Sequence, residues 1–155
     1  MKTISQHTPY DLILLGNHVV DHVQRVTLEQ VQALGLRHGE SNSACPQVLA
    51  QLGQLPADLM PGGSLSNTAY HLQLLQPTLR QFHLGRYGAD VAGRAVEAAL
   101  EQLGIDHMPA DQNIVTFAMH VLVDPTGERT FMPKSPPPGL AESDHWLPLL
   151  RAAKA

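Results

Sequence analysis

Residues 62–69 read GGSLSNTA, and residues 85–93 read GRYGADVAG. Two adjacent glycines let the backbone come close to a ligand or to another segment of the chain. The apolar spacing predicts a helix over 66–75, and the free N–H groups of its first turn would lie beside the Asn67 amide. Such a site suits the hydroxyl groups of a sugar. A tight turn with Ser66 as the helix N-cap is the simpler interpretation of Gly-Gly-Ser alone.

A second candidate site follows the first predicted strand. Residues 11–16 form a short apolar run closed by glycine, which is typical of a strand buried on both faces of an α/β sheet. Asn17 and Asp21 come soon after it. Because ligands of open α/β sheets bind outside the carboxyl ends of strands, an amide and a carboxylate here are well placed to bind hydroxyl groups. Solvated polar side chains in a loop are the alternative.

The remaining periodicity predicts an α/β fold. We expect short strands over 18–26 and 80–84, helices ending near Gly35, starting at Pro46 and covering 91–103 with Val91 on the apolar face, and a hairpin over 116–132. Right-handed helical crossovers between parallel strands explain this alternation. We therefore predict a mostly parallel sheet with flanking helices. A small β lid would be built from segments near 18–43, including 37–43, and near 116–133. A further apolar segment begins at Trp146.

The composition indicates one packed domain. Of the 155 residues, 43% are apolar and 15% are charged, which argues against a disordered chain. The net charge of −4 leaves no basic surface for a nucleic acid or an acidic membrane. Cys45 is the only cysteine, so no internal disulfide is expected, and the sequence shows neither a signal peptide nor a membrane span. We expect a protein of the reducing cytoplasm.

A third motif lies in the predicted hairpin, where residues 127–131 read GERTF. Alone, this motif is a turn entering a strand, with Arg129 as a solvated cation. Taken in order, residues 16–21 (GNHVVD), GGSLSNTA, GRYGADVAG and GERT resemble the ribokinase (PfkB) family of sugar and nucleoside kinases. The longer segment between the first two motifs is most similar to the adenosine-kinase-like branch. The resemblance extends over residues 11–147, and four motifs in register rarely coincide.

The resemblance implies a role for each motif. It places substrate-binding groups at Asn17, Asp21, Gly62, Gly63, Ser64 and Asn67, a ring-covering lid residue at Phe131, and a phosphate-proximal cation at Arg129. The 85–93 motif would be a structural turn rather than a nucleotide loop. The small-molecule partner would be a sugar or a nucleoside, and the lids of two copies could pair to form a homodimer.

The sequence lacks the catalytic motifs of that family. The Gly-Ala-Gly-Asp motif, which supplies an anion hole and the catalytic aspartate, is absent, as is the Asn-x-x-Glu motif linked to magnesium. No catalytic residue is assigned, and ATP and Mg²⁺ are expected only for a complete family member. We therefore interpret residues 1–155 as a partial kinase domain without the ATP-binding half, inactive alone. The alternative is a short non-catalytic protein that binds a small molecule or another chain through its lid.

Other signals do not support a different chemistry. His18 and His22 flank Asp21, but ligands at i and i+4 are a helical arrangement and a strand is predicted here, so no metal site is assigned. Gly16 is not followed by further glycines at the dinucleotide-binding spacing. The nine histidines are spread along the sequence, and most are predicted to occupy surface or ordinary polar positions.

Overall fold

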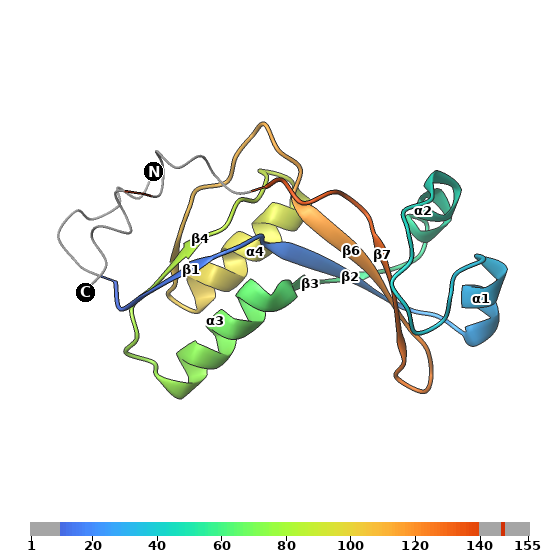
Figure 1. Cartoon of the computed structure of the whole chain (residues 1–155), viewed down its shortest axis with the longest axis horizontal. Helices are drawn as coiled ribbons and strands as arrows, with labels where there is room; N and C mark the ends of the chain where they lie inside the picture. Colours follow the sequence, from blue (N-terminus) through green and yellow to red (C-terminus); the bar gives the residue numbers. More distant parts are fainter. Residues whose placement is uncertain (1–9, 140–146, 148–155) are drawn as a thin grey trace.

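The computed structural model describes residues 10–139 and Leu147 (Figure 1). Apart from Leu147, the apolar segment predicted to begin at Trp146 lies outside the described residues. Of the helices in the described part, none has the length and apolar character needed to cross a membrane. In Figure 1, β1 and β4 occupy one side of the molecule, and β2, β6 and β7 extend to the other.

The order of the elements is the alternation expected for an α/β fold. In sequence they are β1 (Leu12–Leu15), β2 (Val19–Arg25), α1 (Leu28–Ala33), α2 (Pro46–Leu52), β3 (Asp58–Gly62), α3 (Gly63–Leu75), β4 (Gln81–Leu84), α4 (Val91–Gln102), β5 (Asp106–His107), β6 (Phe117–Val123) and β7 (Arg129–Pro133). Helices α3 and α4 lie beside β1 and β4, whereas α1 and α2 lie at the far end of β2 (Figure 1).

The strands form two sheets. Strands β1, β4 and β5 make a parallel sheet in that order, and the second sheet has the order β3-β2-β6-β7. Within the second sheet β2 pairs parallel with β6, while β3 and β7 are antiparallel to their neighbours. The predicted fold class, an α/β arrangement with flanking helices and a β lid, is confirmed. We call the β3-β2-β6-β7 sheet the lid sheet.

The structure differs from the prediction around residues 58–66. Helix α3 begins at Gly63 rather than at Ser66, and Gly62, in an extended conformation, is its N-cap. Strand β3 was not predicted, because Pro61 cannot donate to a ladder and reads as a strand breaker. Here β3 is an edge strand paired with β2 on one side, which is a position that tolerates proline.

The predicted lid segment 37–43 lies against the lid sheet as a loop, not as a strand. Only Ser41 in this segment forms a β-bridge, to Phe131. Gly39 has a φ of +73°, a conformation that glycine adopts without strain. The side chain of Asn42 also donates to the carbonyls of Arg37 and Glu40, which curls the chain into a loop.

Two apolar clusters stabilise the two ends of the molecule. One joins the sheets to α3 and α4 and contains Val20, Ala69, Tyr87, Val96, Leu100 and Ile105. The other packs α1 and α2 against the lid sheet and contains Val26, Val31, Val48, Leu52, Leu122 and Met132. Helix α4 buries Val96 and Leu100 as predicted, but Val91 at its first turn is 60% exposed.

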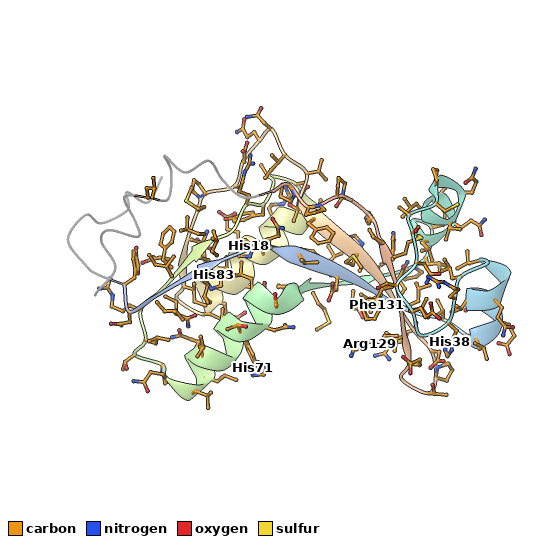
Figure 2. All side chains as sticks on the ribbon, viewed as in Figure 1. His18, His38, His71, His83, Arg129 and Phe131 are labelled. Carbon is orange, nitrogen blue, oxygen red and sulfur yellow. The ribbon has the colours of Figure 1, made fainter. Side chains whose placement is uncertain are left out.

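Three histidines are exceptions to the prediction that most histidines occupy surface or ordinary polar positions. His18, His83 and His120 are all buried, and the rings of His18 and His83 stack with centroids 5.6 Å apart (Figure 2). No ring nitrogen of His18 or His83 has a hydrogen-bond partner among the described residues. Burial, together with the neighbouring histidines, lowers the pKa of His18 to about 3 and that of His83 to about 4. Both rings are therefore neutral in the folded protein at pH 7.

We predict that acid destabilises the fold through these histidines. A histidine with a pKa lowered from 6.5 stabilises the fold above pH 6.5, and this contribution is lost as the pH falls towards the folded-state pKa. On going from pH 7 to pH 5, each of the two histidines should lower the unfolding free energy by about 2 kcal/mol. Urea denaturation at both pH values measures the loss, and His83→Gln should reduce it by about that amount.

The control for this experiment is His71→Gln. His71 lies on the exposed side of α3, away from the stacked pair (Figure 2). The unfolding free energy of the His71→Gln variant should change with pH as much as that of the unmodified protein does. Equal pH dependence of the His83→Gln variant and the unmodified protein would contradict the prediction.

Candidate functional site

The glycine pair at the start of α3 lies directly against strand β2. A Cβ atom at Gly62 would overlap the carboxylate of Asp21, and one at Gly63 would lie 2.8 Å from Cγ2 of Val19. Gly63 also has a φ of +77°, which side chains other than glycine rarely adopt. Both glycines are therefore required for the backbone to pass this close to β2, and they bring Asp21 to the N-terminus of α3.

The register of the lid sheet places further side chains on the Asp21 face. Because side chains alternate along a strand, Val23 shares this face with Asp21. Met119 pairs with Asp21, and Phe131 pairs with Val121, which in turn lies beside Val23. This face therefore carries a carboxylate next to a thioether, aliphatic groups and an aromatic ring. Met119 was not named as a site residue from the sequence. The alternation of side chains along 117–123 could have indicated it, because it places Met119 on the same face as Val121.

Arg129 lies on the same strand and face as Phe131. The guanidinium carbon is 5.9 Å from the centroid of the Phe131 ring, and Figure 2 shows the two side chains next to each other. Burial raises the pKa of the half-buried Asp21 carboxyl, and the charge of Arg129 opposes this rise. Asp21 and Arg129 thus interact electrostatically across the lid sheet.

The other predicted binding residues lie on the flanking elements. Asn17 precedes β2, and its buried Oδ1 has no hydrogen-bond partner among the described residues. Asn67 follows Gly63 by four residues in α3 and therefore lies on the same side of the helix, one turn further on. Ser64 and Asn67 are exposed. The structure thus brings Asp21 into contact with Gly62 and Val19 into contact with Gly63. Asn17 lies before β2, and Ser64 and Asn67 lie in the first turns of α3.

The 85–93 motif forms a junction between α4 and β6. Asp90 caps α4: its Oδ1 accepts hydrogen bonds from the Gly93 amide and the Thr116 hydroxyl, both at 2.7 Å. Its Oδ2 accepts from the Thr116 amide at 2.9 Å, and the Gly88 amide donates to the Thr116 hydroxyl. A Cβ atom at Gly93 would overlap the Gly88 carbonyl. These contacts are all internal, which is the arrangement of a structural turn.

The described residues contain no group of three or more histidine, cysteine, aspartate or glutamate side chains able to hold a metal ion. The Asp21 carboxylate can accept hydrogen bonds from hydroxyl groups, and the face of the lid sheet beside it carries the side chains of Met119, Val23 and Phe131.

Comparison with known proteins identifies the fold. No protein-family model matches the sequence, and neither does any curated protein. Solved structures do match. The adenosine kinase of Trypanosoma brucei brucei aligns with a TM-score of 0.76 and 22% identity over 94% of this chain and 47% of that chain.

Two further structures give the same result. The adenosine kinase of Sinorhizobium meliloti aligns with a TM-score of 0.67 and 25% identity, over 81% of this chain and 39% of that chain. The fructokinase of Halothermothrix orenii aligns with a TM-score of 0.61 and 20% identity, over 86% of this chain and 41% of that chain. The predicted resemblance to the ribokinase family is therefore confirmed at the level of the fold. The chain spans less than half the length of these kinases.

We predict that Asp90→Ala destabilises the protein by about 2 kcal/mol, because it removes a helix cap and leaves the buried Thr116 amide and hydroxyl without their acceptor. Thermal or urea unfolding measures the loss. Asp90→Asn retains an acceptor oxygen and should cost less. Equal stability of the alanine variant and the unmodified protein would show that the junction does not depend on this side chain.

Proposed function

We propose that this chain is the substrate-binding portion of an ATP-dependent sugar or nucleoside kinase. The observation that carries the proposal is the contact of the Gly62 backbone with the half-buried Asp21 carboxylate, on a sheet face that also bears Phe131. Asp21 accepts hydrogen bonds from ligand hydroxyl groups, and Phe131 covers the ring. The match to adenosine kinases and a fructokinase supports this class of ligand.

The roles of the remaining residues follow from their positions. The buried Oδ1 of Asn17 lacks a partner among the described residues, and a ligand hydroxyl can satisfy it. Asn67, on the exposed side of α3, donates and accepts through its amide, while Ser64 lines the first turn. We assign to Arg129, at the exposed end of β7, the role of approaching an incoming phosphate.

The residues of this chain do not fit an ATP–magnesium site. A kinase needs an anion-binding element, a metal and a base that accepts the proton of the attacking hydroxyl. The described residues hold no cluster of metal ligands, and the sequence contains no Gly-Ala-Gly-Asp motif. We therefore assign acceptor binding to this chain and no step of phosphoryl transfer. The second candidate is a non-catalytic protein that binds a small molecule, because the site around Asp21 would bind the same ligands without any transfer of phosphate.

Asp21→Ala should weaken binding of the ligand. Removal of a charged hydrogen-bond acceptor costs about 1.5–3 kcal/mol, which corresponds to a rise in the dissociation constant of about 10- to 150-fold. Calorimetry with adenosine, ribose and fructose measures the dissociation constants of the variant and of the unmodified chain. Glu29→Ala removes the same charge at the start of α1 and should leave the dissociation constant unchanged. An unchanged constant for Asp21→Ala would contradict the assignment of the site.

The purified chain should not transfer phosphate from ATP to any sugar or nucleoside. Loss of a single preorganised anion-stabilising donor typically costs about 100- to 1000-fold in rate, and here the anion hole and the base are both missing from the sequence. Incubation with radiolabelled ATP, magnesium and a panel of acceptors tests this prediction. Turnover above that of a boiled control, copurifying with the protein, would show that catalytic residues had been overlooked.

A further inference from the structure

The loop formed by residues 37–42 lies along the outer edge of β7. Strand β7 is at the edge of the lid sheet, and Ser41 forms an isolated parallel bridge with Phe131. Figure 2 shows His38 in the same part of the molecule as Phe131 and Arg129. The loop therefore contacts the strand that carries both of these proposed site residues.

The loop pairs both backbone groups of Phe131. The Phe131 amide donates to the Glu40 carbonyl at 2.9 Å, and the Asn42 amide donates to the Phe131 carbonyl at 2.8 Å. These two groups point away from β6, so the rest of the lid sheet cannot satisfy them. The position of Phe131 relative to the sheet edge is thus fixed by the loop.

The side chain of Asn42 gives the loop its shape. Its Oδ1 accepts from the Arg37 amide at 2.8 Å, and its Nδ2 donates to the carbonyls of Arg37 and Glu40, both at 3.1 Å. The same Nδ2 lies 3.4 Å from the Phe131 carbonyl. One amide group therefore closes the loop and brings the Glu40 carbonyl and the Asn42 amide to the edge of β7.

Two further contacts join the loop to the β6–β7 hairpin. His38 Nε2 lies 2.8 Å from Asp124 Oδ2, and the Gly39 amide donates to the Thr130 hydroxyl at 2.9 Å. Hydrogen bonds from Thr126 and His38 lower the pKa of Asp124 to about 2, so this carboxylate is ionised at neutral pH. The start of the loop is thereby held on the turn. Its other end is held by Asn42 and by the exposed Arg37 side chain, which contacts the Glu40 carboxylate and the Ser41 carbonyl.

We propose that Asn42 is a positioning residue that orders Phe131 over the ligand. It acts through the backbone of Phe131 and makes no contact with the ligand itself. The proposal rests on the proposed function, since it takes Phe131 as a residue that covers the ring of a bound sugar or nucleoside.

A double-mutant cycle tests the proposal. The ligand is whichever of adenosine, ribose and fructose the unmodified chain binds most tightly by calorimetry. Asn42→Ala should raise the dissociation constant about tenfold, the equivalent of one lost hydrogen bond. In a Phe131→Ala background the same substitution should have no further effect, because the ring that Asn42 positions is gone.

Val48→Ala is the matched control for stability. It removes apolar volume from the cluster that packs α1 and α2 against the lid sheet, to which neither Phe131 nor any residue of 37–42 belongs, and should lower the unfolding midpoint without changing the dissociation constant. An equal loss of affinity in this control, or an Asn42→Ala effect that persists in the Phe131→Ala background, would overturn the positioning role.

Amide hydrogen exchange gives a readout that needs no ligand. In the Asn42→Ala variant the Phe131 amide should exchange about tenfold faster, while the Leu122 amide inside the sheet keeps its rate. Unchanged exchange at Phe131 overturns the proposal. If the unmodified chain binds none of the three ligands, the proposed function fails, and the exchange rates still decide whether Asn42 orders Phe131.

Discussion

At Gly62 and Gly63, strand β3 ends and helix α3 begins without an intervening residue. The backbone can do this only because neither position carries a side chain: Asp21 and Val19 of β2 occupy the space where Cβ atoms would lie. Strand β3 pairs with β2, and α3 buries Ala69 in the cluster that contains Val20. The contact therefore joins the lid sheet to the helix layer and, at the same point, brings a carboxylate to a helix N-terminus.

The lid sheet also has a polar connection inside its own core. Gln24 is buried on β2, where its Nε2 donates to the Leu52 carbonyl at 2.7 Å and its Oε1 accepts from Nδ1 of His120 at 2.8 Å. The carbonyl of Leu52 belongs to the last turn of α2 and also accepts from the Leu55 amide at 3.1 Å. Gln24 therefore hydrogen-bonds the end of α2 and a buried imidazole of β6 at the same time, and connects α2 to the centre of the sheet. The apolar cluster that contains Val31 and Leu52 adds α1 to the same packed unit.

The sequence predicted the elements whose signals are local. The apolar stripe of 91–103, the turn at 125–127 and the glycine closing 11–16 each correspond to an observed element. Strand β3 was not predicted because it exists only by pairing with β2, and its Pro61 gives a contrary local signal. The burial of His83 was not predictable either, since it depends on the ring of His18, which lies between β1 and β2 and stacks against the His83 ring. Within the site, the contact of Asp21 with the glycine pair follows from the fold, whereas the link from Asn42 to Phe131 depends on a loop whose shape no periodicity indicates.

The second glycine motif and the candidate site are connected through His18. A side chain at Gly85 would overlap the His18 ring, so this glycine provides the space in which the imidazole is buried. The ring also packs edge-on against Tyr87, with centroids 5.4 Å apart. Because Asn17 precedes His18 directly, the packing of His18 limits where the Asn17 amide can lie. The segment between β1 and β2 therefore reaches its observed position because Gly85 has no side chain that would overlap His18 or approach the Gly16 carbonyl.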